Sequence, residues 1–188
     1  MNETEKYIAE QIKTGVWGGF ESKEDVLQMI EDLIRDEGEA DGNMLQKVAA
    51  SEFQKKLAAE RTWPVSTDCD RLDDAFVDLN GHGIIALHKT GMTMSDGHED
   101  VSAALHERGR AGVMGYCFYH GQDLERAVQG MGLYLAFGDL KDTDEGKVRV
   151  GELIKSTMER HGLGVSWNGE PDTRLHVEKM DWKRRAER

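Results

Sequence analysis

A histidine and a carboxylate three positions apart are the strongest candidates for chemistry in this sequence. His120 ends the aromatic run GYCFYH, and Asp123 follows it in the stretch HGQDLER. Histidine is the side chain best suited to exchange protons near neutral pH, and a carboxylate can orient its ring. We therefore predict His120 as a general acid or base, with Asp123 as its orienting carboxylate or as a second acid. No nucleophile completes the set.

The same residues also fit a purely structural role. Asp123 falls in the expected first turn of a helix, where a negative charge complements the helix dipole. His120 then flanks the cap, and Arg126 lies one turn further on, where it can pair with Asp123. The sequence leaves both interpretations open.

Other polar side chains follow the predicted strands. Residues 83–88 (GIIALH), 112–119 and the stretch GLYLAFG from Gly132 each resemble a buried strand. If the three strands are parallel, their carboxyl ends share one edge, and open α/β sheets bind ligands at that edge. Besides His120 and Asp123, the ligand-binding residues expected there are His88, Thr90, Thr93, Ser95, His98, Gln122, Arg126 and Asp139.

The stretch STDCDRLDD brings together four carboxylates, which raises the possibility of a site for a hard cation. It lacks the glycine and the distant glutamate of an EF-hand loop. The apolar stripe that includes Leu72 and Phe76 leaves most of the acids on the solvated face of a helix, so a solvated helix start is favoured over a metal site. No HExxH, Walker or dinucleotide-binding motif is present. We predict no metal and no cofactor.

The elements that position these residues divide into two groups. Three amphipathic helical segments fill about the first 60 residues, and Pro64 disfavours helix at Trp63. We predict a helical subdomain over residues 1–62 and an α/β domain, with α+β as the alternative, over 63–188. The second domain is expected to hold a mixed sheet of about five strands. Three would be parallel, and the last two, near 163–167 and 175–177, would form a hairpin.

Composition excludes several classes of protein. The 188 residues carry 24 basic and 36 acidic side chains, and the resulting charge of −12 repels the phosphates of nucleic acids. No apolar stretch is long enough to span a bilayer, so we expect no membrane partner. The N-terminus MNETEKY does not resemble a signal peptide. Two cysteines, Cys69 and Cys117, make no disulfide framework, which favours the cytoplasm.

Three phrases, TDCDRLDDAF, GIIALH and GYCFYHGQDLERA, are distinctive as a set. Together they make the chain resemble a bacterial family that is catalogued as a domain of unknown function, over Trp63 to about Trp182. The resemblance implies a soluble bacterial protein. It supplies no activity and no catalytic residues.

Two classes of function follow. The absence of a complete catalytic set favours a non-catalytic binding or protein-interaction module, whose partner is an unidentified small molecule or a protein, such as a basic one. The alternative is a small hydrolase or lyase that uses His120 and Asp123 at the carboxyl edge of the sheet.

Overall fold

The computed structural model describes residues 1–186, and these form two compact units. The first unit is helical and comprises Met1–Thr67 together with the segment that begins at Lys183. The second comprises Asp68–Trp182 and contains the sheet. Each unit has a hydrophobic core of its own.

The helical unit contains α1 (Glu3–Gly18), α2 (Lys23–Glu37) and α3 (Gly42–Glu60). A capping box starts α2: Ser22 accepts a hydrogen bond from the amide of Asp25, whose carboxylate accepts one from the amide of Ser22. The apolar stripes of the three helices pack together. The fully buried side chains of this core are Ile8, Ile12, Val16, Val26, Ile30, Leu45 and Ala49.

The second unit alternates helices and strands, as predicted. No helix within residues 1–186 combines the length and the apolar character needed to cross a membrane. The elements of the unit are, in chain order, α4 (Asp68–Gly81), β1 (Ile84–Leu87), α5 (Met94–Arg108), β2 (Gly115–Phe118), α6 (Gly121–Val128), β3 (Leu133–Asp139), α7 (Asp144–Arg160) and β4 (Leu175–Val177).

The sheet has four strands in the order β1-β2-β3-β4, and only β1 and β2 are parallel. β3 runs antiparallel to both of its neighbours, so the prediction of three parallel strands is wrong. The direction of β3 is decided by its connection from β2. After α6 the glycines Gly130 and Gly132 adopt φ values of 79° and 77°, and the chain re-enters the sheet at the rim where it left β2.

The prediction of about five strands is also wrong. The segment 163–167 alternates buried and exposed residues as a strand would, but it pairs with β4 at a single position, Ser166 opposite His176. The two main-chain hydrogen bonds of that pair measure 2.8 and 3.0 Å. The expected C-terminal hairpin is therefore reduced to one bridge, and the chain turns away at Glu178 and Lys179.

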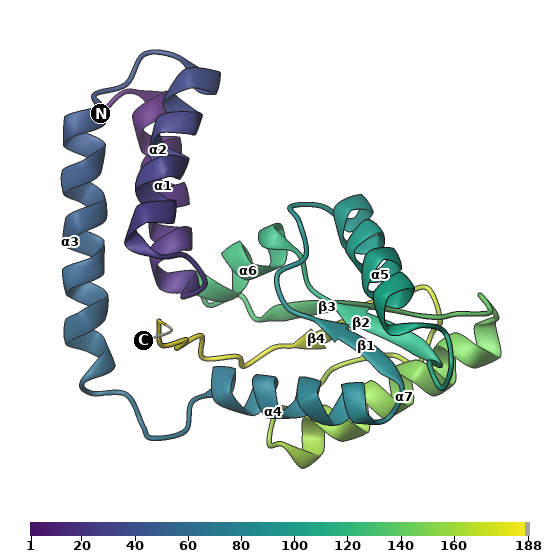
Figure 1. Ribbon diagram of the computed structural model, residues 1–188. Helices are drawn as coiled ribbons and strands as arrows, with labels where there is room; N and C mark the ends of the chain where they lie inside the picture. Colours follow the sequence, from purple (N-terminus) through teal and green to yellow (C-terminus); the bar gives the residue numbers. More distant parts are fainter. Residues whose placement is uncertain (187–188) are drawn as a thin grey trace. The chain divides into compact units, whose positions relative to one another are not determined.

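Helices cover both faces of the sheet, with α4 and α7 on one face and α5 on the other (Figure 1), while the buried side chains of α6, Leu124 and Ala127, join the core under α4 and α7. The face under α4 and α7 holds the main core, which includes Leu72, Phe76, Leu79, Cys117, Leu133, Leu135, Ile154 and Met158. On the opposite face α5 approaches β2 closely. A Cβ atom on Gly97 of α5 would lie 2.2 Å from Cε2 of Phe118, so only glycine permits this packing.

Candidate functional site

The two loops that follow the parallel strands lie side by side, as predicted. The amide of Thr90 donates to the carbonyl of Tyr119 at 3.0 Å, and the amide of Gly121 donates to the carbonyl of Gly91 at 2.9 Å. Thr90 is buried by this arrangement. The loop after β1 and the start of α6 therefore form a closely joined rim, at which His120 is the N-cap residue of α6.

Asp123 is the centre of a buried ionic cluster at this rim. Its side chain is fully buried and forms a bidentate pair with Arg174, with Nη1–Oδ1 and Nη2–Oδ2 distances of 2.9 and 2.5 Å. The main-chain amide of His120 also donates to Oδ2 at 3.2 Å, and Nη1 of Arg126 lies 3.7 Å from Oδ1. Both carboxylate oxygens of Asp123 are thus occupied by groups of the protein itself.

Arg174 is the residue of this cluster that sequence reasoning missed. It precedes β4, is 51 positions from Asp123 in the chain, and also donates to the carbonyl of Tyr134 at 3.1 Å. Its alternation with His176 marks it as lying on the polar side of a strand, but no local spacing identifies its partner. The arginine joins the first turn of α6 to β3 and to the start of β4.

His120 is nearly buried, with 3 % of its surface exposed. Its Nδ1 lies 3.2 Å from Oδ2 of Asp123, but the two atoms are not aligned for a hydrogen bond, and this nitrogen has no partner in the described part of the chain. Burial lowers the pKa of His120 below its ordinary value. The charges of Arg174 and Arg126 lower this pKa further, against the opposing effect of Asp123. The imidazole is therefore neutral at neutral pH.

His88 does not join His120. Its ring stacks on Phe76 of α4 with the ring centroids 4.3 Å apart, and its Nδ1 lies 3.1 Å from the hydroxyl of Tyr119. His120, in contrast, is the N-cap residue of α6, and the charged groups that act on it are those of α6, of Arg174 and of Asp96 in α5. The two histidines follow parallel strands at one rim but have different neighbours.

Asp139 lies at the other rim of the sheet. It is paired in register with Gly115, the first residue of β2, because β3 is antiparallel. Its carboxylate accepts a hydrogen bond from the hydroxyl of Thr143 at 3.0 Å and lines a separate cavity of about 360 Å³. The pocket predicted to unite His88, His120 and Asp139 is therefore not formed.

The remaining predicted residues are distributed around the first rim. Thr93 caps α5, where its hydroxyl accepts a 3.4 Å hydrogen bond from the amide of Asp96. His98 is exposed and stands edge-on to Tyr116 at 5.5 Å between ring centroids. The side chains of Ser95, Gln122 and Arg126 are exposed. Within residues 1–186 no three His, Cys, Asp or Glu side chains are grouped so that they could hold a metal ion.

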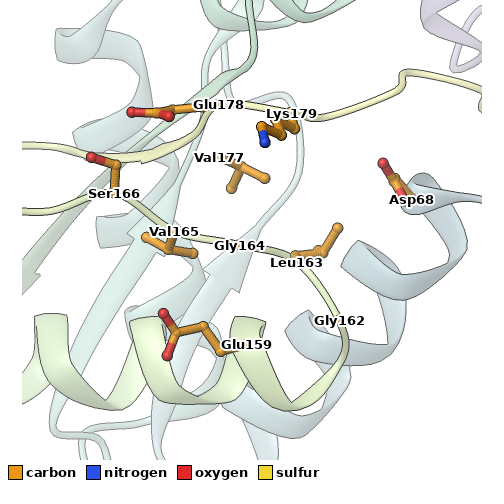
Figure 2. Close-up of a pocket in the computed structure, with 10 residues that line it drawn as sticks. All are labelled: Asp68, Glu159, Gly162, Leu163, Gly164, Val165, Ser166, Val177, Glu178 and Lys179. Carbon is orange, nitrogen blue, oxygen red and sulfur yellow. The ribbon is translucent and has the colours of Figure 1, made fainter.

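A cleft of about 490 Å³ lies away from all the predicted site residues (Figure 2). It opens where the segment 162–166 diverges from the chain at 177–179, beside α7 and the start of α4. Its polar groups are the carboxylates of three acids, one ammonium group and one hydroxyl. The lining residues are Asp68, Glu159, Gly162, Leu163, Gly164, Val165, Ser166, Val177, Glu178 and Lys179.

Charge and surface in this cleft favour a cationic ligand. Its three carboxylates exceed the single ammonium group of Lys179, so the lining carries a net charge of about −2. Asp68 is already engaged, because it pairs with Arg71 and accepts a hydrogen bond from the amide of Asp181 at 2.9 Å. Glu178 is exposed and forms no ion pair within residues 1–186. Val177 and Leu163 supply buried apolar surface beneath these charges.

Comparison with known proteins places the chain in a family but names no activity. No curated protein and no solved structure matches it. A family model described as a domain of unknown function, DUF6891, matches residues 1–186. The match extends beyond the region from Trp63 to Trp182, to include the helical unit. The chain therefore belongs to the DUF6891 family.

Proposed function

We propose that this protein is a non-catalytic binding module that holds a cationic group of its partner in the cleft of Figure 2. The observation that carries the proposal is the state of Asp123. This carboxylate is fully buried and accepts hydrogen bonds from Arg174 and from the main-chain amide of His120 but none from the His120 ring, so its observed partners hold the fold and do not orient a catalytic histidine. The cluster acts instead as a structural link between α6 and β4.

The charge of the molecule supports a basic partner. The acidic excess of −12 raises the local concentration of cations around the surface and repels polyanions, so we include no nucleic acid among the partners. Cys69 and Cys117 are both buried and form no disulfide with each other, which supports a reducing compartment such as the cytoplasm as the setting.

The proposal is tested by titration with cadaverine, an aliphatic diamine, followed by NMR of the main-chain amides. We expect shifts at Gly164, Ser166 and Glu178, because the carboxylates attract the ammonium groups. Glu178→Gln should weaken binding about three-fold, the size of one partly exposed ion pair. The matched control is Glu152→Gln, an exposed acid of α7 outside the cleft, and it should bind like the wild type.

Two results would overturn the proposal. The first is a titration in which no amide of the cleft shifts. The second is a hydrolase or lyase activity, found in a substrate screen, that disappears in His120→Asn while the melting temperature stays near that of the wild type. That result would restore the catalytic interpretation of His120 and Asp123.

A further inference from the structure

One main-chain position that lines the cleft, Gly164, lacks the hydrogen-bonded partner that a regular strand pair would give it. In an antiparallel ladder the residues that hydrogen-bond across to one neighbour recur at every second position. Because Ser166 exchanges both of its main-chain hydrogen bonds with His176, the next pair of a regular ladder would be Gly164 with Glu178. Within residues 1–186 that pair makes no main-chain hydrogen bond, because β4 ends at Val177 and the chain turns away.

Free space lies beside this open position. Gly164 is exposed, and a Cβ atom built on it would meet no atom within 4 Å. The glycine is not required by its backbone, because its φ lies outside the left-handed region. Gly164 also lines the cleft and makes no main-chain hydrogen bond within residues 1–186, so a peptide group of another chain has both a donor and an acceptor to meet there.

The side-chain surroundings add a second requirement. The lining of the cleft includes the largely buried aliphatic residues Leu163, Val165 and Val177, and Glu178 provides a carboxylate that forms no ion pair within residues 1–186. A lysine or arginine side chain combines an apolar stem with a cationic end, and so matches both features at once. A simple amine has no main chain, so it can meet this side-chain requirement but cannot pair with the main chain of Gly164.

We propose that the partner is an extended peptide segment that bears a lysine or arginine. It pairs its main chain with Gly164, as an added strand beside the bridge of Ser166 and His176, and directs its cationic side chain to Glu178. This inference rests on the proposed function of the cleft, and names the class of ligand that the cleft takes.

The test compares three probes on the full chain by calorimetry. The first is the blocked peptide Val-Lys-Val-Lys-Val, the second is the same peptide N-methylated at every main-chain amide, and the third is cadaverine. We expect the peptide to bind about ten-fold more tightly than either of the other probes, because only the peptide can donate main-chain hydrogen bonds.

A substitution that places a side chain at the open position tests the same inference from the side of the protein. Gly164→Leu places a side chain in the open space without backbone strain, and should reduce peptide binding at least about ten-fold. The control is Gly81→Leu at the exposed end of α4, where a Cβ atom also meets nothing within 4 Å, and it should bind the peptide like the wild type. Circular dichroism establishes that both variants are folded. If Gly164→Leu does not fold, the N-methylated peptide on the wild type decides the question.

The outcomes separate the two proposals. If cadaverine binds in the cleft but N-methylation leaves peptide affinity unchanged, the peptide inference is overturned and the proposed function stands. If neither probe binds, both fall. Peptide binding that Gly164→Leu leaves intact would place the peptide elsewhere on the surface and overturn the inference.

Discussion

Asp123 is a buried carboxylate whose negative charge is balanced by the guanidinium of Arg174. Arg174 donates a hydrogen bond to each carboxylate oxygen of Asp123, and the main-chain amide of His120 donates a further one to Oδ2. Burial without this partner would strongly destabilise an ionised carboxylate, so the residue and its arginine act as a unit. The unit fixes α6 against the strand β3 through the carbonyl of Tyr134.

At the scale of this residue we predict that Asp123→Asn lowers the free energy of unfolding by about 3 kcal/mol. The amide cannot balance the guanidinium of Arg174, whose side chain is only 28 % exposed. Urea denaturation monitored by circular dichroism measures the change. The exposed residue Asp100 of α5 provides the control, since Asp100→Asn should stay within about 0.5 kcal/mol of the wild type. Equal stability of the two variants would disprove the structural role of Asp123.

His120 predicts a dependence of stability on pH. Its pKa in the folded protein is lowered, chiefly by burial, so the unfolded chain binds a proton first as the pH falls below the ordinary value of 6.5. The groups that act on this ring are Asp123 and Arg126 of α6, Arg174 before β4, and Asp96 of α5. The stability contributed by neutral His120 is therefore present above that value and is lost below it.

The measurement is the free energy of unfolding at pH values of about 7.5 and about 5.5. We expect a fall in the wild type and a smaller fall in His120→Asn, which has no proton to bind. His106→Asn, at an exposed position on α5, should fall as the wild type does. A fall that is the same in all three proteins would show that His120 is not the group responsible.

At the scale of elements, the contact of α5 with β2 depends on one glycine. Gly97→Ala should destabilise the protein by about 2 kcal/mol, because the added methyl group meets the ring of Phe118, a buried side chain that has little room to move. Thermal unfolding measures the effect. Gly81→Ala, at the open end of α4, is the control and should not lower the melting temperature. A harmless Gly97→Ala would mean that α5 can shift outward at little cost.

The positions of the helices and strands could be predicted because the sequence signals that mark them lie close together along the chain. The capping box of Ser22 and Asp25 and the apolar stripe of α4 depend on residues within a few turns of one another. The direction of β3 could not be predicted in this way. A buried strand shows the same apolar residues whichever way it runs, and its direction depends on how the whole connection from β2 folds. Asp139 was assigned to the wrong rim for this reason.

At the scale of the whole molecule, the acidic surface should make binding in the cleft sensitive to salt. Raising sodium chloride from about 0.05 M to about 0.5 M screens the carboxylates, and we expect the affinity for cadaverine to fall about five-fold. Calorimetry at the two concentrations measures this change. Pentanediol, which has the same chain without charge, should not bind at either concentration. An affinity for cadaverine that is independent of salt would argue against an electrostatic site.

The helical unit raises a separate question at this scale. The family match covers residues 1–186, so the three helices belong to the family's domain together with the sheet. Sequence reasoning placed a boundary after residue 62, and the compact units divide at Thr67 and Asp68. The division into a helical subdomain over residues 1–62 and an α/β domain over 63–188 stays a prediction, and circular dichroism of the 1–62 fragment would show whether the helical part folds without the rest.

The sequence by itself determined the helices, the positions of the first three strands, the charge, and the rim on which His120 and Asp123 lie. These features follow from periodicity, caps and composition, which act over short distances along the chain. Only the tertiary structure decided the direction of β3, the pairing of Asp123 with Arg174, and the cleft beside Gly164. Each of these joins segments that are far apart in sequence, and no local pattern encodes which distant partner a strand or a buried charge will meet.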